Sequence, residues 1–415
     1  MGIEIFHLTI KQVGDVTDGR FHVYAGDAES EAEEVIFTRD EELSGLMDKL
    51  HERKNLAYGF LNFFEQETGC AKIGAKLFKD FFVGHALQKY KDYRAKISDS
   101  APRIAVHIPP TLYYLPWEVL RESEEPTGQF LSIEGSVIRY SSDSPQLDVR
   151  LHADRPDISK LLFMLASPEE NPLIGNYEPE DMSSLQFFRV DPASYNNFRK
   201  MLADVQPFGL AFFGHGEIDA EGNSYLVFVE EVRSLKGRRL LRDLKAGYSF
   251  GNELKAARKM RVACILACES AWVGDKVTFQ NSIAGSILLY TRIDFVIGAQ
   301  TPIDFFAAQE FLINTLAGLA EHMPLDLALT QGRKAIRDII PLGVRKESWR
   351  DWWVPVLYAR TTDFELFPRP NPIPLPGTVV ERATPSGSRF FSAVKSLLNR
   401  ELFADSKAPT DILGG

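Results

Sequence analysis

The run Val262-Ala263-Cys264-Ile265-Leu266-Ala267 is short, continuous and apolar, and it ends at Cys268-Glu269-Ser270. Three similar runs lie at 161–166, 208–213 and 293–298, and each is followed by turn or helix signals. Apolar strands without alternation are typical of a parallel sheet that is covered on both faces. From about residue 155 onward we therefore expect an α/β fold with a mostly parallel central sheet.

The expected helices lie near 193–204, 251–259, 280–291, 304–320 and 325–340. A final strand is expected at 353–358, and it contains Pro355, which has no N–H to donate to a neighbouring strand. This strand is therefore expected either at an edge of the sheet or with Pro355 at the start of its pairing.

The first part of the chain has a different pattern. Residues 1–40 predict a small β region, residues 40–96 predict helices, and residues 103–108 predict a strand. Leu115-Pro116-Trp117-Glu118 then predicts a packed loop that leads into a helix. We expect residues 1–150 to form an N-terminal accessory α+β half.

The main domain is expected over residues 151–366. Beyond it, prolines at every second position from 368 to 376 predict a stiff, extended linker. Residues 367–415 are thus expected to be a proline-rich linker and a C-terminal helical tail.

The composition limits the classes of function. The 415 residues are 45% hydrophobic and carry a net charge of −10, which argues against direct nucleic-acid binding. No apolar run approaches the roughly 18 residues that span a bilayer, and the start lacks a signal-peptide pattern. Three cysteines, with Cys70 and Cys264 expected to be structural, predict a reducing compartment without disulfides. We therefore expect a cytoplasmic protein without a membrane span, a metal site or a cofactor.

Two short segments carry the candidate chemistry, Phe212-Phe213-Gly214-His215-Gly216 and Ala267-Cys268-Glu269-Ser270-Ala271. Both follow strands that are expected to be neighbours, and ligands of open α/β sheets bind at the carboxyl ends of the strands. A thiol needs a nearby base to become a thiolate. His215 lies 53 residues before Cys268, and a histidine about 50 residues upstream of the cysteine is the caspase arrangement. The main-chain N–H groups of Gly216 and Cys268 are expected to form an oxyanion hole.

Five further residues are candidates for a substrate pocket. Glu269 follows the cysteine, and it either supports the turn or faces substrate. Asp275 lies in the next loop, where a solvated structural role is the alternative. Gln300, Thr301 and Asp304 follow the next strand, from which they are positioned to line a side-chain pocket.

Beyond these residues, the chain resembles CHAT domains, the caspase-like protease fold related to separase. Leu115–Glu118 with Phe130-Leu131 resembles the upstream block of the family, Phe213–Gly216 its histidine motif and Leu266–Ala271 its cysteine motif. Later blocks follow in order at Ser282–Ala284, Val296–Gln300 and Trp353–Tyr358, so that the resemblance covers roughly residues 50–360.

This resemblance implies a caspase-like three-layer sandwich in which Cys268 is the nucleophile and His215 the general base and acid. Two departures from the family are Leu266, where many relatives have Ser or Asn, and the segment 300–305. Separase-like relatives have a tryptophan and acidic residues there, whereas this segment has no tryptophan and has Phe305 near the position of an expected acid. These departures argue against the arginine-specific pocket of separase-like relatives and make a pocket for a small or apolar P1 side chain at least an equal alternative, with Asp304 as the residue that could overturn this.

The expected function is a cysteine endopeptidase that cleaves a protein substrate. By resemblance it is a regulated effector in bacterial antiviral defence or cell death, with an activating or regulatory protein partner. The alternative is a catalytically silent caspase-like scaffold or protein-interaction module. A nucleotide-binding α/β protein is disfavoured, because no strand is followed by a dinucleotide-binding or P-loop motif.

Overall fold

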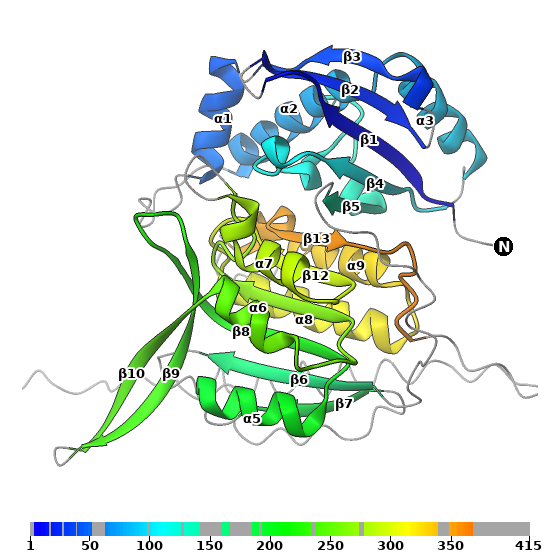
Figure 1. Ribbon diagram of the computed structural model, residues 1–415. Coiled ribbons are helices and arrows are strands. Elements are labelled where there is room, and N and C mark those ends of the chain that lie inside the picture. Colours follow the sequence, from blue (N-terminus) through cyan, green and yellow to red (C-terminus); the bar gives the residue numbers. More distant parts are fainter. Residues whose placement is uncertain are drawn as a thin grey trace, which may run out of the picture.

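The structure is a computed structural model that describes thirteen segments of the chain. They are residues 4–15, 18–26, 29–38, 40–51, 63–97, 100–125, 128–141, 159–166, 185–190, 193–234, 237–273, 278–338 and 348–367. Within these segments the chain forms one thirteen-stranded mixed sheet with helices packed against it (Figure 1). The predicted linker and tail lie outside the described residues, apart from Phe367.

The N-terminal half contributes five strands and four α-helices to the described structure. The strands are β1 (Phe6–Gln12), β2 (Arg20–Ala25), β3 (Glu33–Ile36), β4 (Arg103–Ile108) and β5 (Ser136–Ser141). The helices are α1 (Glu41–His51), α2 (Phe63–Phe81), α3 (Gly84–Lys96) and α4 (Leu131–Glu134). The predicted loop at Leu115–Glu118 contains a short 3-10 turn, η5 (Trp117–Val119), and the next helix along the chain is α4.

The remaining strands and helices come from the second half of the chain. The strands are β6 (Ser159–Ala166), β7 (Leu185–Arg189), β8 (Gly209–Ile218), β9 (Ser224–Ser234), β10 (Gly237–Ala246), β11 (Val262–Ala267), β12 (Phe295–Ala299) and β13 (Pro355–Ala359). The helices are α5 (Tyr195–Val205), α6 (Gly247–Leu254), α7 (Ile283–Tyr290), α8 (Phe305–Ala320) and α9 (Leu325–Asp338), followed by the 3-10 turn η10 (Ser348–Trp353).

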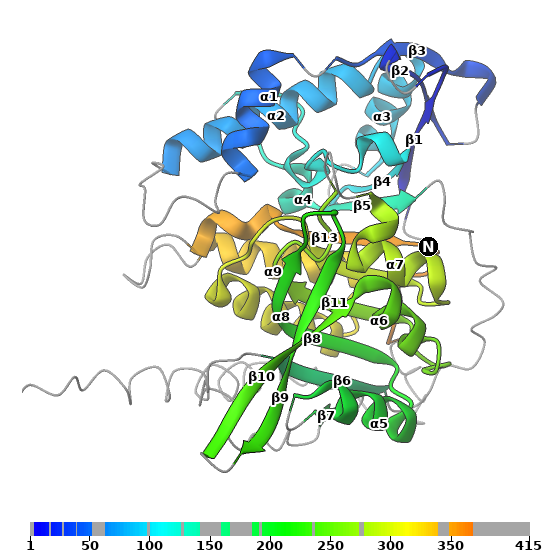
Figure 2. The same cartoon turned by 60° about the vertical axis from the view of Figure 1, so that its left-hand side comes forward.

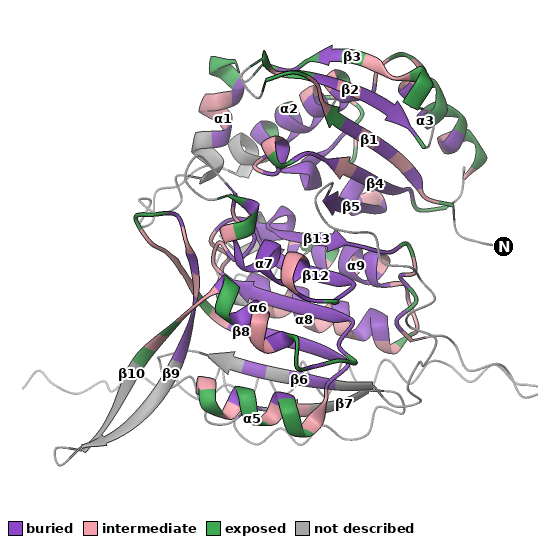
Figure 3. Cartoon of the chain, in the orientation of Figure 1, coloured by how far each residue is buried: buried purple, intermediate pink, exposed green. Residues whose placement is uncertain are grey.

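The four apolar runs form the expected parallel strands. β6, β8, β11 and β12 are neighbours in this order, and all their mutual pairings are parallel. β11 and β12 are buried along their whole length. Figures 1 and 2 show α6 and α7 on one face of these strands and α8 and α9 on the other. In Figure 3 the described residues of these strands are mostly buried up to the point where β8 meets β9, as the continuous apolar pattern predicts.

The last strand does not lie at an edge. β13 pairs with β12 on one side and with β5 on the other, so the edge alternative is wrong. Its pairing with β12 begins at Pro355, opposite Ala299. A proline at the first position of a strand removes no interior hydrogen bond, which explains how the strand is accommodated inside the sheet.

The pairing of β13 with β5 makes the sheet continuous across residue 150. From β5 the order runs through β4, β1 and β2 to β3. The N-terminal half therefore extends the same sheet that contains β8 and β11.

The sequence patterns did not predict the hairpin of β9 and β10. These strands pair antiparallel over ten residue pairs and project from the body of the protein (Figures 1 and 2). The start of β9 pairs with the second half of β8, from His215 to Ile218. Strand β8 thus leaves the central sheet and enters the base of the hairpin at His215.

Buried ion pairs tie the helices and loops to the sheet. Arg103 of β4 donates two hydrogen bonds to Asp326 of α9, at 2.6 and 2.7 Å, and the Ser136 hydroxyl donates a third at 2.6 Å. Arg261 likewise donates a hydrogen bond to the buried carboxylate of Asp294, at 2.6 Å. No described helix has the length and apolar character needed to cross a membrane.

Removing one partner of such a buried ion pair should lower the stability of the fold. Asp326→Ala is expected to lower the free energy of unfolding by about 3–5 kcal/mol, because the Arg103 guanidinium would stay buried without its counter-charge. Glu29→Ala, which breaks the exposed Lys11–Glu29 pair, should change it little. Denaturant unfolding of both variants measures the difference, and equal effects would contradict the expectation.

Candidate active site

Strands β8 and β11 bring the two candidate segments together. They pair in parallel up to Gly214 and Ala267, so that His215 and Cys268 are the next residues after this parallel pairing ends. This is the adjacency that the sequence predicts. His215 is exposed, whereas Cys268 is half-buried.

Gly216 lies against the main chain of Cys268. A Cβ atom at position 216 would overlap the carbonyl oxygen of Cys268 and would lie 3.4 Å from its nitrogen. The backbone can approach this closely because glycine has no side chain. Gly216 is therefore required by the contact between the two segments.

The turn after Cys268 is held by Ser270. Its hydroxyl donates to the Ile265 carbonyl at 2.7 Å and accepts from the Ala299 N–H at 2.9 Å, which links the ends of β11 and β12. Glu269 adopts a left-handed conformation with φ 58°. Such a conformation is unfavourable for a residue with a side chain and persists only where the surrounding structure imposes it. Cys268 consequently lies at the start of a tightly fixed turn.

The surroundings of Cys268 favour the neutral thiol. Burial raises the pKa of the Cys268 thiol, and the carboxylates of Glu269 and Asp351 raise it further. The nearby main-chain N–H of Ile303 lowers this pKa and so opposes the effect. A thiol in this setting needs an added positive charge or a base before it is an effective nucleophile.

The five pocket candidates have different positions. Glu269 is half-buried beside Cys268, whereas Asp275 lies outside the described residues. Gln300 is buried and hydrogen-bonded to Glu118, Arg139 and the main chain of Trp353. Thr301 is also buried. The Asp304 carboxylate accepts from the Ala307 N–H at 3.4 Å in the first turn of α8. The structure therefore leaves Glu269 as the described candidate that is both next to the sulfur and partly accessible.

The sequence patterns missed two groups beside the thiol. The Ile303 N–H has no side-chain signature, so no motif could have identified it. Asp351 is buried, and its carboxylate accepts from the Asp304 N–H at 2.6 Å. The sequence signal for Asp351 is the pair of tryptophans that follows it, Trp352 and Trp353. Both are fully buried, so the residue before them lies close to the core.

The other thiols and the possible metal ligands do not form a second centre in the described part of the chain. Cys70 and Cys264 are buried, and burial raises the pKa of Cys264 to about 12. The described residues contain no group of three or more His, Cys, Asp or Glu side chains that could hold a metal ion.

Comparison with known proteins gives only a distant likeness. No family model matches the chain, and no curated protein matches it. It is similar to chains in two crystal structures of the Saccharomyces cerevisiae separase–securin complex, with TM-scores of 0.48 and 0.47 and identities of 11% and 12%. Each match covers 86% of this chain and 30% of the other chain. A likeness this distant carries no argument about activity.

Gly216→Ala tests the contact between the two segments. The new methyl group would overlap the main chain of Cys268, and overpacking of this kind is expected to lower the free energy of unfolding by about 1–3 kcal/mol. Gly45→Ala is the matched control, because a Cβ atom there meets nothing within 4 Å. Denaturant unfolding compares the two variants, and an unaffected Gly216→Ala protein would contradict the described contact.

Alkylation by iodoacetamide tests the protonation state of the Cys268 thiol. In the folded protein Cys268 should react first, because Cys70 and Cys264 are buried. Its rate should increase with pH through a midpoint above the roughly 8.5 of an unperturbed cysteine, since a raised pKa means less thiolate at any given pH. Peptide mapping by mass spectrometry measures the rate at each cysteine, with the unfolded chain as control. A midpoint at or below the ordinary value would refute the neutral-thiol description.

Proposed function

We propose that the chain is a caspase-like cysteine endopeptidase in which Cys268 and His215 form the catalytic dyad. The observation that carries this proposal is their placement at the carboxyl ends of two paired parallel strands, with Gly216 packed on the main chain of Cys268. Neighbouring strands place a candidate nucleophile and a candidate base at the same edge of the sheet, and this placement supports a dyad.

The proposed reaction begins when the imidazole of His215 takes the proton of the Cys268 thiol. The thiolate attacks the carbonyl carbon of a peptide bond, and the main-chain N–H groups of Gly216 and Cys268 stabilise the oxyanion. The C–N bond then breaks, and His215 gives its proton to the leaving amine. Water hydrolyses the thioester and regenerates the thiol. No step requires a metal or a cofactor.

The pocket beside the thiol is proposed to accept a small or apolar P1 side chain. The segment 300–305 has no tryptophan, and the carboxylate of Asp304 is used in the first turn of α8. Of the two acidic groups that act on the sulfur, Asp351 is buried and Glu269 is half-buried. A basic P1 preference in the cleavage products would therefore implicate Glu269 and reject this part of the proposal.

A regulated enzyme accounts for the raised pKa of Cys268 better than a constitutively active one does. Burial and two nearby carboxylates keep the pKa of Cys268 raised, so that the unliganded chain has little thiolate at neutral pH. We propose that a protein partner or substrate activates it, as expected of an effector in bacterial defence or cell death. In this proposal residues 1–150 are the accessory half, 151–366 the protease domain and 367–415 a linker and tail.

The raised pKa of the Cys268 thiol also supports the second candidate, a catalytically silent scaffold. A thiol that stays neutral beside an exposed histidine would allow the fold to persist as a protein-interaction module without activity. The two candidates differ in whether Cys268 ever forms a covalent bond with a peptide.

Cleavage of a diverse peptide library, analysed by mass spectrometry, tests the proposal. The wild type should cleave, Cys268→Ala should abolish cleavage, and His215→Ala should reduce it by about 10²–10⁴-fold, the usual contribution of general acid–base catalysis. Cys264→Ala removes a buried thiol from the same strand and should retain activity. The cleaved sequences also report the P1 preference.

Two results would reject the endopeptidase. One is cleavage that persists in Cys268→Ala. The other is a wild-type protein that neither cleaves the library nor forms a covalent adduct between Cys268 and peptidyl electrophiles, which would favour the scaffold.

A further inference from the structure

One row of residues runs from His215 across the base of the projecting hairpin (Figure 1). His215 of β8 pairs with Val227 of β9, and Val227 pairs with Leu244 of β10. Residues that lie directly opposite one another on antiparallel strands share a face of the sheet. The side chains of His215, Val227 and Leu244 therefore lie in one line on the same face.

This face is not the one that packs on the neighbouring helices. The alternate residues of β9, Leu226 and Phe228, are buried in the core, and the ring of Phe228 contacts Tyr195 of α5 and Phe250 of α6. Successive side chains of a strand point to opposite faces of the sheet. The row that contains His215 thus lies on the face away from α5 and α6.

Leu244 is an exposed apolar residue at the end of this row. It is 44% exposed, whereas the other described large apolar side chains of β8, β9 and β10 are buried or half-buried. On the same face, Arg242 of β10 forms an ion pair with Glu217 of β8. Leu244 is therefore an apolar spot with a charged border, and protein contact surfaces commonly combine an apolar centre with a polar rim.

The order of the strands sets the direction of the row. β11, β8, β9 and β10 are successive neighbours, so Cys268 and Leu244 lie on opposite sides of His215. In the proposed reaction Cys268 bonds to the carbonyl carbon of the scissile bond, and His215 gives its proton to the leaving amine. The part of the substrate after the scissile bond therefore begins at the imidazole, on the side where the hairpin lies.

The spacing of the strands gives the position of this contact in the substrate. Neighbouring strands lie about 4.8 Å apart, so two strand spacings place Leu244 about 10 Å from His215. An extended peptide advances about 3.3 Å per residue. A substrate that leaves the dyad along this row reaches Leu244 about three residues after the scissile bond.

We propose that Leu244 is a specificity residue of the proposed endopeptidase: it binds an apolar side chain about three residues after the scissile bond, at the P3′ position. This inference rests on the proposed roles of Cys268 and His215. It adds a substrate class, peptides that are apolar on the primed side, to the proposed P1 preference. It also gives the hairpin a role in the reaction.

Leu244→Lys tests the proposal, because lysine keeps a long exposed side chain and puts a positive charge at its tip. In the diverse peptide library, the wild type should prefer apolar residues at P3′, and Leu244→Lys should prefer acidic ones. For peptides with an apolar P3′ residue, KM should increase about fivefold with little change in kcat, because the contact is the same in substrate and transition state. Ile36→Lys is the matched control, because it places the same charge at an exposed apolar position, 66% exposed, on β3.

Leu244→Ser is the second variant, for the case that Leu244→Lys does not fold in a thermal unfolding assay. It should abolish the apolar preference at P3′ without replacing it. If Leu244 only packs on Val227, both variants would lower the stability and leave the P3′ preference unchanged. That result, or an equal change of preference in Ile36→Lys, would overturn the proposal.

Peptide binding to the Cys268→Ala protein separates this inference from the proposed function. Library peptides enriched on the immobilised protein should be apolar, and adding Leu244→Lys should replace apolar residues by acidic ones. This change without cleavage by the wild type would support a peptide contact at Leu244 and reject the endopeptidase. Cleavage with an unchanged P3′ preference would do the reverse. If the Cys268→Ala protein enriches no peptide, the proposed contact is rejected.

Discussion

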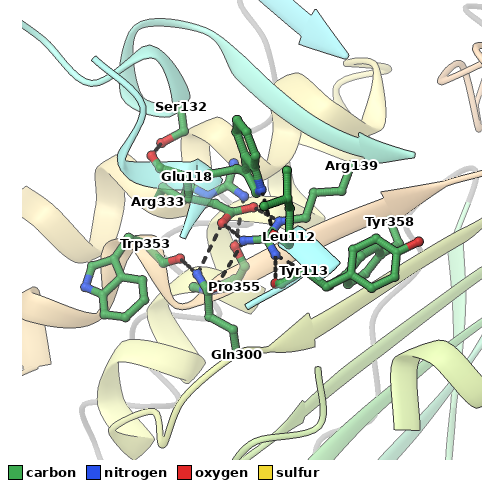
Figure 4. A network of polar contacts seen from close by, with 11 residues as sticks. Leu112, Tyr113, Glu118, Ser132, Arg139, Gln300, Arg333, Trp353, Pro355 and Tyr358 are labelled. Atoms are coloured by element: carbon green, nitrogen blue, oxygen red, sulfur yellow. Dashed lines mark hydrogen bonds and ion pairs between the residues drawn. The ribbon is translucent and has the colours of Figure 1, made fainter. Parts of the chain in front are cut away.

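The ion pair between Glu118 and Arg139 is the constraint on which the rest of the structure depends. Both side chains are fully buried, and the guanidinium of Arg139 contacts both oxygens of the carboxylate. It also donates to the Tyr113 carbonyl at 3.1 Å, to the Tyr358 hydroxyl at 3.5 Å and to Gln300 (Figure 4). A buried charge without its partner is strongly destabilising, so neither residue can be desolvated before the other is in place. Gln300, which follows β12, joins this pair through hydrogen bonds to both residues and so links the N-terminal half to the strands that carry the site.

Main-chain pairing within the sheet also connects the N-terminal half to the candidate site. Strand β5, which carries Arg139, pairs with β13, and β13 pairs with β12. β12 in turn pairs with β11, whose end leads into Cys268. The candidate site is therefore built on strands from distant parts of the sequence. Its geometry is a property of the whole sheet and does not belong to the two motifs alone.

The sequence predicted the elements that depend on local hydrophobicity, and it failed where the partner was distant. The buried parallel strands followed from continuous apolar runs such as Val262–Ala267. The hairpin did not, because residues 224–246 mix charged and apolar residues without a clear period. Gln300 was expected to line a pocket because it follows a strand. Its partner Glu118 is 182 residues away in the chain, and no local pattern contains that information.

The two members of the proposed dyad have different mechanical support, and this difference bears on regulation. Cys268 is fixed by Ser270 between the ends of β11 and β12, in a setting that keeps its thiol neutral. His215 is exposed and lies where β8 leaves the central sheet for the base of the projecting hairpin. Gly216, the next residue of this strand, pairs with β9 and packs on the main chain of Cys268, so the base of the hairpin adjoins both members of the proposed dyad. In a dyad whose thiol is held neutral, the position of the base is a variable that sets reactivity.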